Sequence, residues 1–237
     1  MKNKWLILIL VINAIDLKAQ ENKMTFGLQY KPIIPAEYFN SSYIEATSAD
    51  YTFNLNPKYS NSFGMIIRHK VNKTFSIESA LNYTQRNYTL KISNEKIKLN
   101  DFTSFGMRSY EIPLQLLTYV RVSEFWYLNV AFGLSHNILA SDIYSDGKTE
   151  KYYQKTYRKN GGYRALLANI GVEYRTEKSR SYYIGTSLHR PWGEISRIYP
   201  GYKNENNSFN QTDFKNQFFL DLSGNFITID FRYFFAE

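Results

Sequence analysis

The chain contains no cysteine and only three histidines among its 237 residues. The absence of cysteine excludes a disulfide scaffold, a Cys-ligated zinc or iron–sulfur site, a Cys nucleophile and the lipid-modified Cys of a bacterial lipoprotein. His69, His136 and His189 are far apart in sequence, and no carboxylate cluster accompanies them. We therefore expect neither a metal site nor a cofactor. Beyond residue 20, no apolar run approaches the ~18 residues of a membrane helix.

The first twenty residues have the three parts of a secretory signal. Lys2 and Lys4 precede an apolar stretch over residues 5–15, and small or tolerated residues follow near Ala19 and Gln20. The stretch is too short to span the roughly 30 Å of hydrocarbon in a bilayer. The sequence predicts a cleaved signal peptide over residues 1–20 and one exported domain over residues 21–237.

What the sequence does contain is aromatic residues, at 17% of the chain, and a hydrophobic pattern of period two. Alternation of apolar and polar residues is typical of strands with two unlike faces. Eight segments show it: residues 26–30, 63–68, 75–86, 110–121, 125–140, 164–175, 182–188 and 227–233. The connections between them are alternately long and short, as in outer-membrane barrels with short periplasmic turns and longer extracellular loops. We predict an all-β fold, an eight-stranded antiparallel up-and-down transmembrane β-barrel.

Aromatic residues concentrate at the predicted strand ends. Trp126, Tyr174 and Tyr182 lie near the short turns, whereas Phe63 and Tyr110 lie near the long connections. Two belts of aromatic rings at the membrane interfaces would produce this distribution.

The polar face of the predicted strands carries charges of both signs. In a barrel of ~8 strands this face points into a lumen that side chains just fill, and buried charges need opposite partners. We predict a structural network of luminal ion pairs that blocks free passage. Its members are Arg68, Glu78, Arg86, Glu111, Arg121, Glu173, Arg175, Asp230 and Arg232.

The last predicted strand contains a change of pattern. Apolar residues fall on even numbers from Phe218 to Phe226 and on odd numbers from Ile227 onward. We expect a β-bulge near residues 224–227. The segment 218–222 then either projects beyond the membrane or pairs with an extended neighbour above the bilayer.

Several segments resemble the PorT-like outer-membrane β-barrel proteins of the Bacteroidetes type. The most specific is Glu111-Ile112-Pro113-Leu114 within residues 109–117, and residues 18–20, 26–28, 132–134 and 169–174 also fit. The resemblance implies an outer-membrane barrel without catalytic residues. Because the namesake of the family is implicated in type IX protein secretion, it also implies a partner in an outer-membrane or secretion complex.

Two kinds of site chemistry compete with this interpretation. Ser187 and His189 share a face near the long-connection end of their strand, with Glu194 nearby in sequence, as in an enzyme that modifies outer-leaflet lipid. We favour polar rim residues and no enzymatic activity. Asp142 and Asp146 could contribute to a calcium site, but a solvated loop explains them better.

The third long connection is basic and aromatic. It contains Lys148, Lys151, Lys155, Arg158 and Lys159 with Tyr152, Tyr153 and Tyr157. Such a stretch can contact phosphates and stack on bases. For an exported barrel we favour a solvated loop or contact with lipopolysaccharide over nucleic acid. The Asn-rich segment 203–211 is a candidate binding loop.

The sequence thus favours a non-enzymatic protein in the outer membrane of a Gram-negative bacterium. It would have a filled lumen, contact outer-membrane lipid and lipopolysaccharide, and act through its long extracellular loops as a structural, binding or secretion-associated component. The alternatives are an outer-leaflet lipid-modifying enzyme and a soluble periplasmic lipocalin-like binder.

Overall fold

The computed structural model describes residues 24–35, 43–48, 50–149, 152–202 and 218–236, all as strands and their connections. The predicted signal peptide and the Asn-rich segment 203–211 lie outside these residues. Across the part of the chain that is described, no helix is long and apolar enough to cross a membrane.

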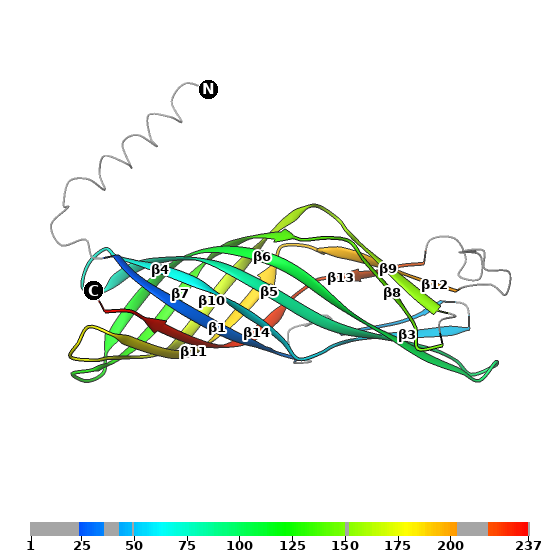
Figure 1. Ribbon diagram of the computed structural model, residues 1–237, viewed down its shortest axis with the longest axis horizontal. Helices are drawn as coiled ribbons and strands as arrows, with labels where there is room; N and C mark the ends of the chain where they lie inside the picture. Colours follow the sequence, from blue (N-terminus) through cyan, green and yellow to red (C-terminus); the bar gives the residue numbers. More distant parts are fainter. Residues whose placement is uncertain (1–23, 36–42, 49, 150–151, 203–217, 237) are drawn as a thin grey trace, which may run out of the picture.

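Eight strands form a closed barrel (Figure 1). Each pairs antiparallel with its neighbours in chain order, and the first strand pairs with the last. This confirms the predicted fold class. The strands are β1 (Met24–Ile34), β4 (Ser60–Lys70), β5 (Phe75–Asn94), β6 (Leu99–Arg121), β7 (Trp126–Leu139), β10 (Gly162–Arg175), β11 (Ser181–Pro191) and β14 (Phe226–Phe234).

The register fixes the tilt of the strands. A line of paired residues that starts at Val120 passes once around the barrel and returns to the same strand ten residues away, at Tyr110. With a rise of about 3.3 Å per residue and about 4.8 Å between strands, this stagger gives a tilt of about 41°. That tilt lies within the usual range for a barrel of this size.

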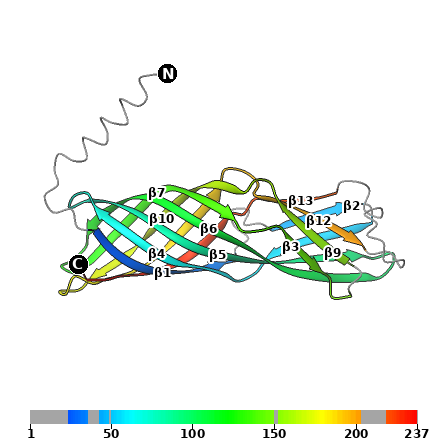
Figure 2. The same cartoon turned by 45° about the horizontal axis from the view of Figure 1, so that its top comes forward.

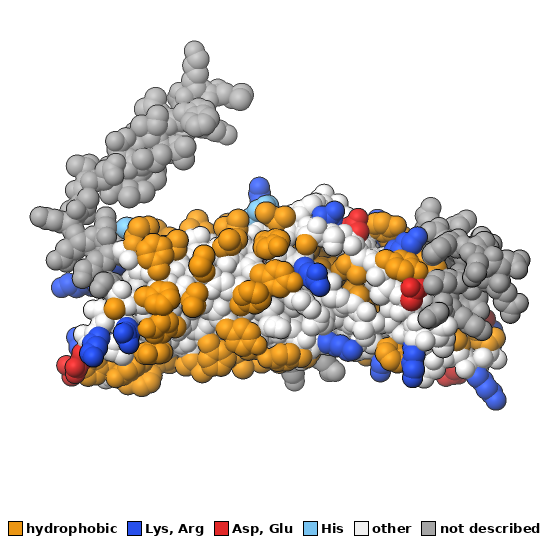
Figure 3. All heavy atoms as spheres, in the orientation of Figure 1, with side chains coloured by type: hydrophobic (Ala, Val, Ile, Leu, Met, Phe, Trp, Pro, Cys, Tyr) orange, Lys and Arg blue, Asp and Glu red, His pale blue; other side chains and the backbone are white. Residues whose placement is uncertain are grey.

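The outer surface of the barrel is an apolar band, visible in the left half of Figure 3. Along each strand, apolar side chains that point outward alternate with polar side chains that point inward, and the outward ones form the band. One exposed member from each strand illustrates it: Leu28, Met65, Leu81, Leu114, Phe132, Ile170, Ile184 and Ile229. Outward apolar and inward polar residues are the arrangement of a barrel surrounded by acyl chains.

Aromatic side chains lie at both edges of this band. At the short-turn end the rings of Trp126 and Tyr174 are 5.0 Å apart, and those of Tyr182 and Tyr233 are 5.2 Å apart. Near the other edge Tyr83 contacts both Phe63 and Tyr110. Rings of this kind are found at membrane–water interfaces.

Beyond the apolar band the molecule continues as a second β structure, called here the extension (right half of Figures 1 and 2). Strands β5 and β6 are 20 and 23 residues long and reach into it. There β3 pairs with the upper part of β5, and β2 with β3, while β8, β9, β12 and β13 form a separate sheet. Their bounds are β2 (Ile44–Ser48), β3 (Tyr51–Pro57), β8 (Ile143–Asp146), β9 (Tyr152–Arg158), β12 (Ser196–Tyr202) and β13 (Leu220–Leu222). Much of what we expected to be long loops is therefore folded sheet.

The extension has an apolar core of its own. Tyr88, Leu90 and Ile92 of β5 face the interior here, together with residues of both sheets. The buried members are Phe53, Leu55, Tyr88, Leu90, Ile92, Phe105, Met107, Leu139, Tyr152, Ile195, Ile198, Leu220 and Leu222. The interior is thus polar inside the apolar band and apolar above it.

The pattern change near Phe226 reflects this switch, and the predicted β-bulge is wrong. Leu220, Leu222, Phe226, Thr228 and Asp230 are all buried, so even-numbered residues face inward throughout. The chemistry of the interior changes, not the phase of the strand. Strands β13 and β14 are instead separated by Gly224, whose φ of 71° is a backbone conformation that residues with a side chain disfavour. Segment 220–222 pairs with β12, as one of the two expected alternatives required.

Candidate functional site

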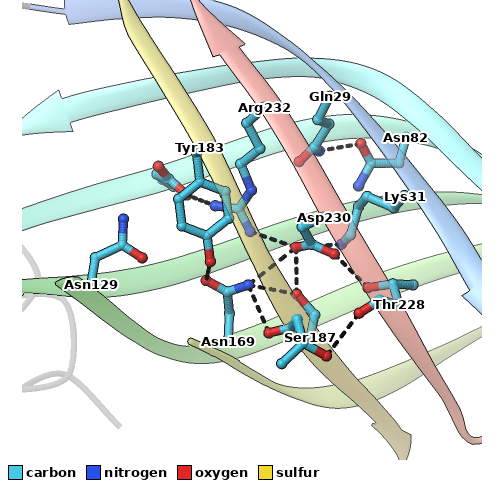
Figure 4. Close-up of polar contacts among 12 residues, drawn as sticks. Gln29, Lys31, Asn82, Asn129, Asn169, Tyr183, Ser187, Thr228, Asp230 and Arg232 are labelled. Carbon is cyan, nitrogen blue, oxygen red and sulfur yellow. Dashed lines mark hydrogen bonds and ion pairs between the residues drawn. The ribbon is translucent and has the colours of Figure 1, made fainter. Parts of the chain in front are cut away.

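The lumen of the barrel is filled by polar and charged side chains, and Asp230 lies at the centre of them (Figure 4). Its carboxylate accepts hydrogen bonds from Arg232 Nη2 at 2.8 Å, Ser187 Oγ at 2.5 Å and Asn169 Nδ2 at 3.1 Å. Thr228 Oγ1 donates to it at 2.5 Å, and Lys31 Nζ lies 4.0 Å away. A carboxylate with these partners is compensated even though no part of it reaches solvent.

A chain of alternating charges crosses the lumen from Asp230. Arg232 contacts Glu78 at 2.7 Å, and Glu78 also contacts Arg68 at 2.7 Å. Arg68 then reaches Glu173 at 2.8 Å, and Glu173 contacts Arg175 at 2.6 Å. The chain links strands that are distant in sequence, so it ties the barrel wall together across its interior.

Aromatic rings cover the arginines of this chain. The guanidinium of Arg68 lies 3.8 Å from the ring centre of Phe234, and that of Arg175 lies 4.0 Å from Tyr127. Arg232 lies over Tyr183, at 4.6 Å. Such contacts stabilise cations that have lost water.

Tyr183 in turn needs a pair of glycines. Gly171 and Gly185 are register partners on β10 and β11. A Cβ atom at either position would lie within 2.3 Å of the tyrosine hydroxyl. Because neither glycine has a side chain, the ring of Tyr183 fits against them. The Tyr183 hydroxyl donates a hydrogen bond to Asn169.

The upper lumen, toward the extension, holds a second group of polar residues. Glu111 accepts a hydrogen bond from Asn82 at 2.9 Å and lies 3.6 Å from His189 Nε2. Arg86 donates to Tyr163 Oη at 3.2 Å and to the backbone oxygen of residue 224 at 3.0 Å. Arg86 therefore lies at the level where the polar lumen meets the apolar core.

Eight of the nine predicted network residues line the lumen, and Arg121 does not. It is the exposed last residue of β6, and its guanidinium donates to the backbone oxygens of Ser123 and Glu124 in the short turn that follows. The alternation of β6 would direct Arg121 inward, but the barrel ends at this level, so the side chain reaches water instead.

The network includes a cation that the sequence analysis missed, Lys31. It is 7% exposed and faces Asp230. The alternating segment predicted from the sequence ends at residue 30, before Pro32, whereas β1 continues to Ile34. The alternation of Gln29 with its outward neighbours would have identified Lys31 as the next inward residue.

Ser187 and His189 share the inward face, where each has structural partners. Ser187 donates to Asp230, and the imidazole of His189 stacks on Phe226 with ring centres 4.2 Å apart. Within the described residues, no hydrogen bond joins Ser187 to His189. Glu194 is on the extension and pairs with Lys159. The barrel wall separates the Ser–His pair from acyl chains, which counts against a site that modifies membrane lipid.

Asp142 and Asp146, the candidate calcium ligands that we interpreted as loop residues, have protein partners. Asp142 accepts hydrogen bonds from the backbone N and from Nε of Arg158, both at 3.0 Å, and these bonds lower the pKa of its carboxyl group. Asp146 accepts one from the hydroxyl of Tyr144. Over the described ranges, no three His, Asp or Glu side chains form a group that could hold a metal ion.

The basic, aromatic connection is a strand rather than a solvated loop. Tyr152 and Tyr153 are buried, and Tyr157 is exposed. Arg158 pairs with Asp142, while Lys159 pairs with both Glu194 and Asp221. Residue 151 lies outside the described ranges. Two of the cations are therefore neutralised by neighbouring carboxylates.

The sequence matches no protein-family model and no curated protein. Among solved structures, the fold is similar to the outer membrane protein OprG from Pseudomonas aeruginosa, with a TM-score of 0.52 and 10% identity over 91% of this chain and 97% of that chain. The outer membrane protease OmpT from Escherichia coli aligns over 90% of this chain and 91% of its own at a TM-score of 0.30 and 11% identity, too low to support an argument. An outer membrane channel from Pseudomonas putida aligns over 94% and 98% at 0.24 and 10%, with the same limitation. At such low identity the likeness to OprG concerns the fold alone, and this chain therefore has the fold of an outer-membrane-type transmembrane β-barrel.

Proposed function

We propose that this protein is a non-enzymatic barrel of the Gram-negative outer membrane that presents the extension at the cell surface. The filled interior carries the proposal. Within the apolar band the lumen contains the charge network around Asp230, and above it the extension contains an apolar core. Because polar and apolar barriers follow one another along the axis, activity belongs to the outer surface of the extension and not to a pore.

The orientation follows from the connections. The short turns and both ends of the described chain lie at one end of the barrel, and the extension lies at the other (Figure 1). In outer-membrane barrels the short turns are periplasmic. The proposed orientation therefore places the extension outside the cell, beside lipopolysaccharide, after export by the predicted signal peptide.

Planar-bilayer recording tests the closed lumen. We expect no conductance steps from the refolded protein, whereas large ohmic steps would contradict the proposal. The double variant Arg232→Ala, Glu78→Ala removes the two side chains that meet at 2.7 Å in mid-lumen. Because the apolar core of the extension still closes the axis, we expect no conductance steps from this variant either.

The soluble, lipocalin-like alternative disagrees with the distribution of side chains. A soluble barrel has apolar residues inside, whereas Leu114 and Phe132 are more than 60% exposed here and Asp230 is buried. Membrane fractionation tests this point. Retention of the mature protein in outer membranes after carbonate extraction supports the proposal, and release into the soluble fraction contradicts it.

Participation in a secretion complex is the second candidate function. It rests on the resemblance of residues 109–117 to the PorT-like family. In this chain the segment lies in β6 and directs Glu111 into the lumen. Affinity purification from solubilised outer membranes, followed by mass spectrometry, tests it. Stoichiometric recovery of other outer-membrane or secretion proteins supports the role, and recovery of the barrel alone contradicts it.

A further inference from the structure

The lipid-facing surface of the barrel contains an apolar hollow of about 520 Å³. It lies where β7, β10, β11, β14 and β1 are adjacent, over the seam between the first and last strands. Its apolar lining includes Leu28, Val172, Ile184 and Phe231. The volume falls in the ~300–1,000 Å³ range of small-molecule sites. Since these strands carry the apolar band, the medium facing the hollow is acyl chain.

Four aromatic residues line the hollow at its short-turn side. Trp126, Tyr174, Tyr182 and Tyr233 are cross-strand neighbours, and their rings contact each other in two pairs. Tyrosine and tryptophan combine an apolar body with a polar end that favours the headgroup level. The hollow therefore has an apolar part within the membrane and a polar edge at its surface.

Cations follow directly beyond this edge. Arg180 precedes Tyr182 by two residues, so it belongs to the same side of the chain as Tyr182 and Ile184. It is exposed in the turn between β10 and β11, where its backbone N–H donates to the hydroxyl of Thr176. Glu177 and Lys178 are exposed in the same turn, so the turn carries a net charge of one positive unit with Arg180. A guanidinium at this level suits a lipid phosphate, which it can bind with two parallel hydrogen bonds.

We propose that the hollow binds one glycerophospholipid from the leaflet at the short-turn end. An acyl chain fills the space over Val172 and Ile184, and the phosphate meets Arg180. Arg180, two residues before the outward Tyr182, is expected to hold this lipid more firmly than the lipid over the second apolar hollow of the barrel, about 420 Å³ in volume. The proposal depends on the transmembrane fold and not on the function proposed above.

Native mass spectrometry of the full mature chain tests the apolar half. The protein is released from nanodiscs of equal phosphatidylethanolamine and phosphatidylglycerol, and the retained lipid is counted. We expect one lipid on the wild type and about tenfold less on Val172→Trp and Ile184→Trp, which fill the hollow. Ile77→Trp is the matched control, because it is an outward apolar residue on β5, away from the hollow. Equal retention by all four proteins, or an equal loss in the control, overturns the proposal.

The phosphate half is tested with Arg180→Glu. We expect retention to fall about tenfold, whereas Lys73→Glu, at the short turn between β4 and β5, leaves it unchanged. Unchanged retention in Arg180→Glu contradicts the assignment of the phosphate. Heat-modifiable migration on gels establishes that each variant is folded, so loss of lipid is not mistaken for loss of structure.

Discussion

The barrel and the extension are built partly from the same strands but have opposite interiors. Along β6, Leu114 and Leu116 face outward within the apolar band while Glu111 and Gln115 face inward. In the first part of the same strand, which lies in the extension, Phe105 and Met107 face inward and Asn100 and Ser104 face outward. The alternation continues without interruption, and only the medium around the strand changes. Period two therefore identifies a strand, whereas the surrounding solvent decides which face is apolar.

The largest expected effect distinguishes a fully buried carboxylate of the barrel from a half-buried one near the surface of the extension. Asp230→Ala removes the common partner of Arg232, Ser187 and Asn169. We expect the free energy of unfolding to fall by about 3–5 kcal/mol, because the buried cations Arg232 and Lys31 lose a counter-charge and Ser187 and Asn169 lose a buried acceptor. The control Asp221→Ala removes a half-buried partner of Lys159 and Arg197 near the surface and should cost about 1 kcal/mol or less. Urea titrations in detergent measure both, and equal losses would contradict a buried luminal network.

Two leucines on β5 test the cores of the two regions. Leu90 is fully buried in the extension, whereas Leu81 faces the membrane. Leu90→Ala leaves a cavity and should destabilise the extension by about 2–5 kcal/mol, while lipid refills the space left by Leu81→Ala. Hydrogen exchange of β3 and the upper part of β5 should rise only in Leu90→Ala. Similar exchange in both variants would show that the extension has no core of its own.

The outward faces of β6 offer the next comparison. Leu114→Arg places a charge among acyl chains and should cost about 2–4 kcal/mol. Asn100→Arg, outward on the extension, should stay within about 0.5 kcal/mol of the wild type. Refolding titrations into lipid vesicles measure the difference. A large effect of Asn100→Arg, or none of Leu114→Arg, would reverse the assignment of the two media.

The smallest effect concerns pH and the extension alone. Hydrogen bonds from Arg158 lower the pKa of Asp142, so its ionised form favours the folded state. This contribution is present above the unfolded pKa of ~3.9 and is lost as the pH falls through the lower, folded value. Because the side chain is 47% exposed, we expect below about 1 kcal/mol. We measure the hydrogen-exchange protection factors of the β9 amides at pH 6 and at pH 3. The decrease in protection between the two pH values should be smaller in Asp142→Asn than in the wild type. Identical pH dependence would exclude the pair as its cause.

Much of the barrel could be predicted from the sequence, because alternation and the lengths of connections report directly on strands and turns. All nine network residues were assigned to the lumen on that basis, and eight of them lie there. Arg121 was assigned wrongly, since alternation does not reveal where the barrel ends. Lys31 was missed because Pro32 resembles the end of a strand.

The extension was harder to predict for a physical reason. Its strands are short, and β2, β8 and β13 have five residues or fewer. Their pairing depends on neighbours that are distant in sequence, so local patterns contain little of the information. The even-numbered apolar residues from Phe218 to Phe226 were the available signal. They marked an apolar interior above the membrane and not a shift of phase.

Spin labelling along β6 tests the inversion of the two regions most directly. Because the chain lacks cysteine, single cysteines can be introduced without other changes. In lipid vesicles, labels at Leu114 and Leu116 should collide with oxygen more than with a water-soluble nickel complex, and labels at Asn100 and Ser104 should show the reverse preference. Labels at Gln115 and Phe105 should be shielded from both. Contact of the nickel complex with Leu114, or oxygen preference at Ser104, would contradict a strand that passes from membrane to water with its faces unchanged.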